Sequence, residues 1–312
     1  MKHITLFETL AGFQAAQATL DRPNVSLIEA TMGVNYLPYV APPTVYDFLD
    51  ILYANAAGEK KVDSNILDPS LGYTPIGLCI AGEGFFGPNE KARWISLKYM
   101  NCTTPETGSL TAQGIYWGNN GNDISTITNI QTTHNGGTNW GFLAADWIKG
   151  TNIPSIFNEN NEWNTSVLGA VNQYAVTDIQ GREKTNLILA SATSQSTWMT
   201  DTSITNEDSA GYAPAACCCA RYHTVGTETG DWYLGASGEM CMIIVQKPAI
   251  NAKLAQIAAV YSTDSISSLA DNSYWSSTEH KSSEAFGVGA GSGSISYGGK
   301  DYNYSVVAML QY

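Results

Sequence analysis

The sequence predicts an α+β protein, and two observations carry that prediction. Charged residues make up only 14% of the 312 residues, whereas aromatic residues make up 11% and glycines number 29, a composition that favours strands and loops. Helices are expected at 213–222 and near 249–260, and a run of short strands follows them to the C-terminus. Helices that are segregated from a run of strands are typical of α+β folds.

Residues 1–62 are predicted to form a small N-terminal module, and residues 63–312 the main domain. The module has few apolar residues for a core of its own, so we expect it to need a partner or further copies of itself. Its expected elements are helices at 9–20 and 44–54, strands at 24–31 and 33–40, and a linker at 56–64.

The main domain opens with a clear strand pattern. Apolar residues alternate strictly at Ile76, Leu78 and Ile80, which predicts a strand at 73–81. The other expected elements are strands at 93–100, 186–190 and 305–312, short helices at 144–149 and 166–175, and a loop at 193–208.

Charge and hydropathy exclude several kinds of partner. The net charge of −13 argues against nucleic acid and against an anionic membrane surface. No apolar run reaches the roughly 18 residues of a membrane-spanning helix, so no membrane insertion is expected. The N-terminus lacks the apolar stretch and cleavage site of a signal peptide, which predicts synthesis in a bacterial cytoplasm.

The residues that usually carry catalysis form no recognisable motif. The four histidines lack metalloprotease spacing, and neither a glycine-rich phosphate loop nor a nucleophilic serine turn is present. Asp231 and Glu239 are the one candidate carboxylate pair, and we expect Asp231 to fix a turn and Glu239 to cap the following helix or face solvent. The chain is therefore predicted not to be an enzyme and to bind no cofactor and no metal ion. The six cysteines are expected to be reduced and buried: Cys79, Cys102, Cys217, Cys218, Cys219 and Cys241.

The segment 280–304 differs from the rest of the chain in composition. It consists mostly of Ser, Gly, Tyr, Asn, Asp and Ala. Tyrosine gives a large rigid contact area and the small polar residues adapt to a ligand, as in antibody combining sites. The apolar residues Phe286, Val288 and Ile295 are expected to point inward and hold a sheet, with the intervening residues on the opposite face.

Several motifs resemble one group of C-type-lectin-fold proteins. Gly230-Asp231-Trp232-Tyr233-Leu234 followed by Gly238-Glu239 is similar to the "GDWYLP…GE" signature of that group. The group includes the variable proteins of diversity-generating retroelements, especially those of gut Bacteroides and their phages. Similar segments occur in the same order at 94–100, 104–108, 116–118, 215–222 and 274–279. The sequence departs from the pattern at Gly235, where the group often has Pro, at Phe286 and at 307–309.

The resemblance implies a C-type lectin fold, elaborated as in formylglycine-generating enzymes. It also implies a receptor-binding protein of a phage tail fibre or tail tip, which resides in the virion and recognises a protein or glycan on a bacterial surface. Residues 1–62 would then attach the protein to other virion tail proteins, and a homo-oligomer, with a trimer as one possibility, is expected. The expected core residues are Trp232, Tyr233, Leu234, Trp275, Val306 and Leu310.

The resemblance places a diversified ligand-binding region at 272–304. Mutagenesis of adenines in Asn codons yields the Ser, Gly, Asp, His and Tyr residues that are frequent in this region. Tyr297, Tyr302 and Tyr304 are expected to carry most of the binding energy, and replacing the last two by Ala is expected to leave the melting temperature nearly unchanged. The predicted site residues are His280, Ser282, Ser283, Glu284, Gly287, Gly289, Ser292, Ser294, Ser296, Tyr297, Gly298, Gly299, Asp301, Tyr302, Asn303 and Tyr304.

Other functions on the same scaffold are less well matched. Formylglycine-generating enzymes use a late cysteine pair, and no cysteine follows Cys241. In a calcium-dependent lectin we would expect a carboxylate cluster, whereas the nearest motif, Gly87-Pro88-Asn89, lacks the acid, so binding should survive chelation. A structural virion protein of the baseplate or capsid surface stays an alternative, and an adhesin of the bacterium itself is disfavoured because no signal peptide is found.

Overall fold

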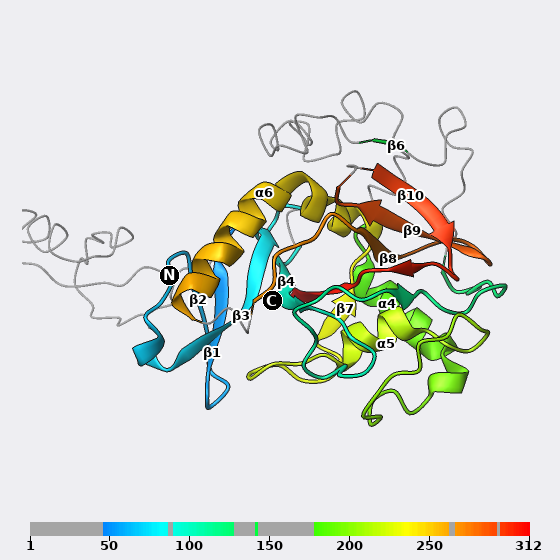
Figure 1. The fold of residues 1–312 in the computed structure, drawn as a ribbon, viewed down its shortest axis with the longest axis horizontal. Coiled ribbons are helices and arrows are strands. Elements are labelled where there is room, and N and C mark those ends of the chain that lie inside the picture. The colour runs from blue at the N-terminus through cyan, green and yellow to red at the C-terminus, as the bar shows by residue number, and fades with distance from the viewer. Residues whose placement is uncertain (1–45, 87–89, 128–140, 143–177, 262–265, 292–293) are drawn as a thin grey trace, which may run out of the picture. The chain divides into compact units, whose positions relative to one another are not determined.

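The computed structural model describes residues 46–86, 90–127, 141–142, 178–261, 266–291 and 294–312 (Figure 1). The compact unit formed by the described residues is Tyr46–Tyr312. Several predicted elements lie outside the described residues: those at 9–20, 24–31, 33–40, 144–149 and 166–175.

A six-stranded antiparallel sheet forms the centre of this unit. Its strands, in spatial order, are β2 (Lys60–Asp63), β1 (Ile51–Asn55), β3 (Tyr73–Ala81), β4 (Arg93–Tyr99), β12 (Val307–Gln311) and β7 (Trp232–Leu234). The last strand of the chain therefore lies in the middle of the sheet. The strands predicted at 73–81, 93–100 and 305–312 are confirmed to within two residues.

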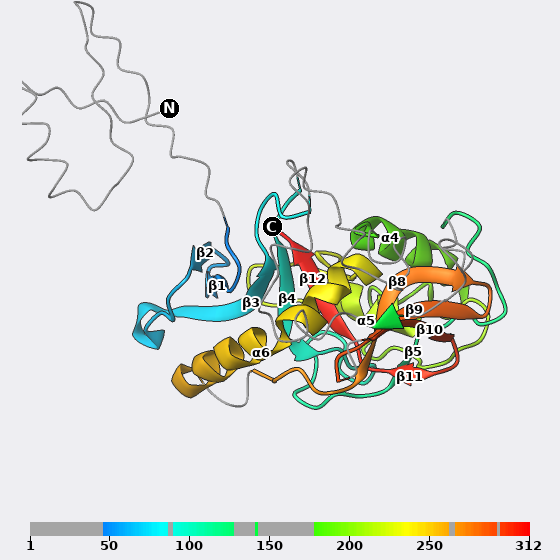
Figure 2. The same ribbon diagram turned by 90° about the horizontal axis from the view of Figure 1, so that it is seen from above.

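A second antiparallel sheet follows in the C-terminal part. It contains β6 (Gly141–Phe142), β10 (Ser294–Gly299), β9 (Glu284–Gly289) and β8 (Ser273–Lys281), in that order, and lies beside the six-stranded sheet (Figure 2). A short pair, β11 (Asn303–Tyr304) with β5 (Ile115–Tyr116), completes the strands of the described residues. With its helices, the unit has the mixed α+β architecture with antiparallel sheets that the sequence predicts.

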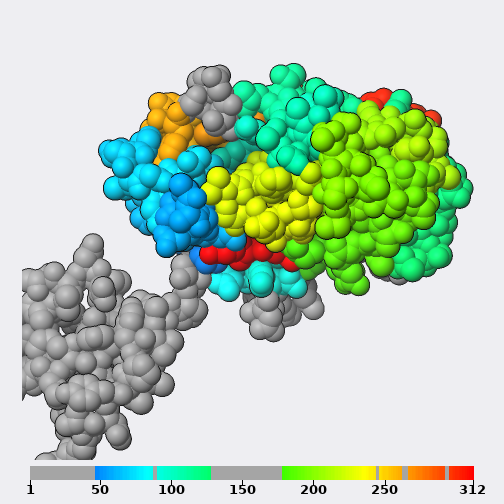
Figure 3. Space-filling view, turned by 90° about the horizontal axis from the view of Figure 1, so that it is seen from below, coloured from blue at the N-terminus to red at the C-terminus, as the bar shows by residue number. Residues whose placement is uncertain are grey.

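Three helices cover the six-stranded sheet. Helix α6 (Ser237–Val260) packs on one face (Figure 1), while α4 (Gly181–Ser191) and α5 (Pro214–Arg221) pack on the other. Figure 3 shows the face of the unit opposite α6, where the green and yellow chain from α4 to β7 lies beside the red C-terminal strand. Among the described residues, two short 3-10 helices, η1 (Pro69–Leu71) and η3 (Thr193–Gln195), lie in connections. In the described residues, no helix is both long enough and apolar enough to cross a membrane.

Strand alternation divides the core into two layers. In β1, Ile51 and Tyr53 pack under α6, whereas Leu52 and Ala54 pack on the side of α4 and α5. This double burial explains a wrong prediction, because 44–54 was expected to be a helix. A strand buried on both faces is a continuous apolar run, and periodicity alone does not distinguish such a run from a helix.

Three other predictions need correction. The expected linker at 56–64 contains strand β2, and both β1 and β2 belong to the six-stranded sheet, so the compact unit begins at Tyr46 and not at residue 63. The strand expected at 186–190 lies in helix α4, whose buried residues include Gly181, Lys184, Thr185 and Ile188 at helical spacing. The helix near 249–260 is the second half of α6, which continues through Pro248.

The expected core residues are confirmed as buried. Trp232, Tyr233, Leu234, Trp275, Val306 and Leu310 are each at most 3% exposed. All six cysteines are also free and buried, as expected.

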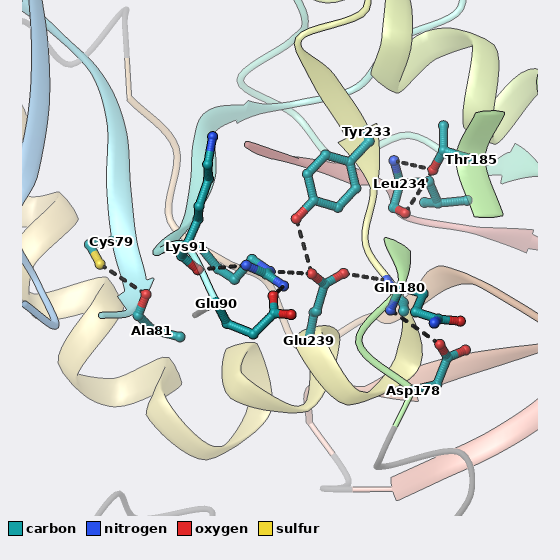
Figure 4. A network of polar contacts seen from close by, with 12 residues as sticks. Cys79, Ala81, Glu90, Lys91, Asp178, Gln180, Thr185, Tyr233, Leu234 and Glu239 are labelled. Atoms are coloured by element: carbon teal, nitrogen blue, oxygen red, sulfur yellow. Dashed lines mark hydrogen bonds and ion pairs between the residues drawn. The ribbon is translucent and has the colours of Figure 1, made fainter. Parts of the chain in front are cut away.

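A buried ion pair joins the sheet to α6. Glu239 in the first turn of α6 is fully buried and accepts hydrogen bonds from the Ala236 amide at 2.9 Å, the Tyr233 hydroxyl at 3.0 Å and the Arg93 guanidinium (Figure 4). Arg93 also donates to Glu90 at 2.7 Å. Burial raises the pKa of the Glu239 carboxyl, and the positive charge of Arg93 opposes that shift. Glu239 therefore caps the helix, as one of our two expectations had it, but it does not face solvent.

Replacing Glu239 by Gln is expected to lower the free energy of unfolding by about 3–5 kcal/mol, because the Arg93 charge loses its buried partner. Urea unfolding of both proteins measures the change. Glu228→Gln is the matched control, since Glu228 is exposed and should change stability by no more than about 0.5 kcal/mol. A loss below about 1 kcal/mol for Glu239→Gln would contradict this role.

Candidate functional site

The predicted site residues differ widely in exposure. Asp301, Tyr302 and Asn303 are exposed, and Tyr302 retains 54% of its surface. Ser292 and the side chain of Ser294 lie outside the described residues, as does the Gly87-Pro88-Asn89 motif. The half-buried residues are Ser282, Ser283, Glu284, Ser296, Tyr297, Gly299 and Tyr304, and the buried ones are His280, Gly287, Gly289 and Gly298.

The inward direction of three apolar residues is confirmed. Phe286 and Val288 of β9 and Ile295 of β10 are at most 1% exposed and belong to the core beneath α6. The opposite face of this sheet was expected to be open, and that expectation is wrong. The ring of Tyr304 covers it at Gly287 and packs on the ring of Trp275, with 4.2 Å between the ring centroids.

Gly287 and Gly298 lie directly beneath the rings of Tyr304 and Tyr302, and we call these two glycines the floor of the site. A Cβ atom at Gly298 would come within 2.7 Å of the Tyr304 hydroxyl and 3.3 Å of the Tyr302 ring. A Cβ at Gly287 would come within 3.2 Å of the Tyr304 ring and 2.9 Å of a backbone oxygen. Real Cβ contacts are rarely so short, so these glycines serve packing and are not themselves ligand contacts.

Tyr297 and His280 lie on the other side of the sheet from Tyr302. Their rings pack at 4.5 Å between centroids, and Tyr297 packs edge-on against Phe286 at 6.3 Å. Strand alternation puts Tyr297 on the same face as Ile295, which is the core face. The expectation that Tyr297 belongs with Tyr302 and Tyr304 on one ligand-binding face is therefore corrected.

A buried ion pair supports the exposed residues 301–303. Lys300 and Glu279 are both fully buried and form an ion pair, and the Lys300 ammonium also donates to the Asn122 carbonyl at 3.0 Å. The ammonium lies 4.6 Å from the centroid of the Trp117 ring. Burial raises the pKa of the Glu279 carboxyl and lowers the pKa of the Lys300 ammonium, while their mutual attraction opposes both shifts.

The loop that carries Trp117 is fixed to the same support. The Trp117 indole donates to the Ser276 carbonyl at 2.8 Å, and the Ile124 amide donates to Glu279 at 3.2 Å. Strand β5 pairs with β11, which aligns Tyr116 with Asn303. The sequence pattern did not single out Lys300 or Tyr116 as site residues, although Tyr116 belongs to the motif at 116–118 and Lys300 lies between the predicted site residues Gly299 and Asp301.

These contacts define one exposed surface, which we call the Tyr302 surface. It consists of the exposed residues Asp301, Tyr302 and Asn303 and the half-buried residues Ser282, Ser283 and Tyr116. The turn at 282–283 is held to it, because the Lys300 amide donates to the Ser283 carbonyl at 2.9 Å. An aromatic side chain with polar neighbours on a fixed backbone is suited to ligand binding.

A separate groove of about 520 Å³ lies at the start of α4, near Glu90 and Gln180 in Figure 4. Its arginines are already engaged. Arg93 is paired with Glu239 and Glu90, and Arg182 donates to the carbonyls of Gly230 and Asp231. We therefore regard the groove as part of the scaffold. Within the described part of the chain, no three His, Cys, Asp or Glu side chains gather closely enough to hold a metal ion.

Comparison with known proteins gives little further information. No protein-family model and no curated protein matches the chain. The crystal structure of a fimbrial protein from Bacteroides ovatus is similar, with a TM-score of 0.46 and 15% identity, over 85% of this chain and 49% of that protein. The chain thus spans about half the length of that protein. The likeness is too distant to bear on fold or function.

The two tyrosines of the C-terminal segment should differ in their effect on stability. Tyr304→Ala is expected to lower the free energy of unfolding by about 2–3 kcal/mol, because the ring packs on Trp275 and fills the space above Gly287. Tyr302→Ala should change it by no more than about 0.5 kcal/mol, because the side chain is mostly exposed. Urea unfolding of both variants tests this. Equal effects of the two substitutions would contradict the difference in packing.

Proposed function

We propose that this protein is a receptor-binding protein of a bacteriophage tail, which recognises a bacterial surface protein or glycan through the Tyr302 surface. The observation that carries the proposal is the exposed Tyr302 on a fixed floor of glycines, Tyr304 and the buried Glu279–Lys300 pair. Rigid tyrosines with small polar neighbours bind at low cost in conformational entropy. The protein acts by binding and not by catalysis.

The division between scaffold and surface supports this function. The motif residues Trp232, Tyr233, Glu239 and Trp275 are all buried, whereas the Ser-, Asp- and Asn-containing turns at 282–283 and 301–303 reach the surface. A protein whose ligand-binding residues change between variants needs this separation, because substitutions at the surface then leave the core intact.

The order of elements supports a C-type lectin scaffold of the retroelement-associated type. The last strand, β12, returns to pair with β4 and β7, and the sheet β8–β9–β10 is inserted before it in the chain. Sheet edges and loops between these elements then present the variable residues, as the sequence motifs imply.

The negative charge of the protein limits the kinds of receptor that its Tyr302 surface suits. The chain carries a net charge of −13, and the six residues of the Tyr302 surface include Asp301 and no basic residue, while the adjacent Lys281 is paired with Glu284 at 3.1 Å. An uncharged or cationic receptor suits such a surface better than a polyanion.

The proposal also includes the assembly of the protein in the virion. The residues before the compact unit attach it to other tail proteins, and it assembles as a homo-oligomer, with three copies as one arrangement.

Binding to intact cells tests the proposal. Labelled full-length protein is expected to bind a subset of gut Bacteroides strains, and Tyr302→Ala should weaken that binding about 30-fold with an unchanged melting temperature. Flow cytometry over a concentration series measures this. Leu71→Ala is the control, since Leu71 is 58% exposed on η1 and should bind as the unaltered protein does.

The other outcomes separate the alternatives. Equal binding by Tyr302→Ala and the unaltered protein would contradict the assigned surface. An absence of binding to every strain, for a protein that still enters virions, would favour a structural virion protein. Binding that is lost in EDTA and restored by calcium would favour a calcium-dependent lectin.

Sequencing the 3′ end of the gene across one phage population tests diversification. Codons for Asp301, Tyr302 and Asn303 are expected to vary, with adenine positions changed most often. Codons for Gly287 and Lys300 should stay constant, because their substitution disturbs the floor and the ion pair. A uniform 3′ end would rule out a diversified site.

A further inference from the structure

Two cysteine thiols meet in the core on the side of α5. The Sγ atoms of Cys102 and Cys218 lie 3.2 Å apart, although the residues are 116 positions apart in the sequence. Cys102 lies in the turn after β4, and Cys218 lies in the middle of α5. The side chains are 8% and 0% exposed, respectively.

We propose that Cys102 and Cys218 form a disulfide bond when the folded protein meets a small-molecule disulfide oxidant. The bond would join the turn after β4 to helix α5. This inference is independent of the proposed function, since it concerns the scaffold alone.

The backbone at both cysteines is held in place, so the thiol contact is a fixed feature of the fold. The Cys102 carbonyl accepts from the Ile204 amide at 2.7 Å, and the preceding Asn101 side chain accepts from the Thr103 amide at 2.7 Å. The Cys218 carbonyl accepts from the Tyr222 amide at 3.1 Å within the last turn of α5. A disulfide forms only where the backbone already brings the two side chains together, and this pair meets that requirement.

The remaining cysteines are directed elsewhere. The thiols of Cys79, Cys219 and Cys241 each point to a backbone carbonyl, at 3.3, 3.9 and 3.0 Å. Consecutive residues of a helix point in different directions, so Cys217 and Cys219 do not share the direction of Cys218. The geometry therefore selects one pair from six cysteines.

The reaction follows ordinary thiol–disulfide exchange. With oxidised glutathione as oxidant, one cysteine thiolate attacks a sulfur of glutathione disulfide, forms a mixed disulfide and releases one glutathione thiolate. The second cysteine thiolate then attacks the cysteine sulfur of the mixed disulfide and releases the second glutathione. The two thiol protons pass to the two glutathione molecules, which are reduced, while the cysteine pair is oxidised. Cys102 is the first to react, because it is less buried and burial raises the pKa of the Cys218 thiol.

The bond would have most effect outside the cell. Cytoplasmic thiols stay reduced, whereas released proteins meet oxidising conditions. Cross-linking residues that are 116 positions apart closes a long loop, and the restriction of the unfolded chain stabilises the folded state more for long loops.

The test uses full-length protein that is purified in reductant and then incubated with oxidised glutathione below its melting temperature. Thiols counted after denaturation are expected to fall from six to four, and mass spectrometry of alkylated digests should find one linked peptide pair that contains Cys102 and Cys218. The melting temperature should rise by several degrees and return to its initial value in reductant.

Two variants provide the comparison. Cys218→Ser should keep all of its remaining thiols and show no oxidant-dependent rise in melting temperature, whereas Cys219→Ser, altered in the same helix, should still form the bond. If Cys218→Ser does not fold, the peptide map of the unaltered protein decides the matter. Six free thiols after exposure to the oxidant, a stable adduct with glutathione, or a different linked pair would overturn the proposal.

Discussion

The candidate site depends on the buried ion pair between Lys300 and Glu279. Removing two charges from water costs several kcal/mol for each ion, so such a pair is stable only where further contacts satisfy both groups. Here the Asn122 carbonyl, the Ile124 amide and the Trp117 ring complete those contacts. The pair thereby binds three segments that are distant in sequence: the loop after β5, the end of β8 and the turn between β10 and β11. The exposed residues begin directly after Lys300, so their backbone is fixed at one end by the core.

Buried polar contacts also occur in the middle of β8, directly before Glu279. Ser276, Ser277 and Thr278 carry polar side chains into the core, where Ser276 and Thr278 are hydrogen-bonded and the Ser277 hydroxyl has no hydrogen-bond partner among the described residues. The Ser276 hydroxyl donates to the Phe286 carbonyl at 2.7 Å, and the Thr278 hydroxyl accepts from the Ser237 amide at the start of α6 at 2.9 Å. Glu239 then joins α6 to β4 and β7. The polar side chains of Ser276, Thr278 and Glu239 thus connect elements within the core, and a buried polar group that is hydrogen-bonded specifies one arrangement of the elements around it.

The parts of the fold that follow from local pattern were predictable, and the parts that depend on long-range contacts were not. Alternation in β3 and the alanine-rich run of α5 predict their elements, because one period fits each of them. The predictions of a helix at β1 and of a strand in part of α4 were wrong, since short apolar runs fit both periods. In the site, strand alternation correctly predicts that Phe286, Val288 and Ile295 point inward. It does not predict that Tyr304 covers the opposite face. The pairing of Lys300 with Glu279 and of Cys102 with Cys218 is a property of the folded chain alone.

Because Tyr304 covers that face, glycines of the C-terminal segment have a packing role. Their frequency suggests a freely variable surface, but Gly287 and Gly298 have no room for a Cβ atom beneath Tyr304 and Tyr302. These positions are constrained by packing in the same way as a core residue is. Freedom to vary belongs instead to the residues that project beyond the floor, Asp301, Tyr302 and Asn303, and to the neighbouring turn at 282–283. Under the proposed function, a substitution there changes the surface offered to a ligand and leaves the tyrosine–tryptophan packing and the ion pair untouched.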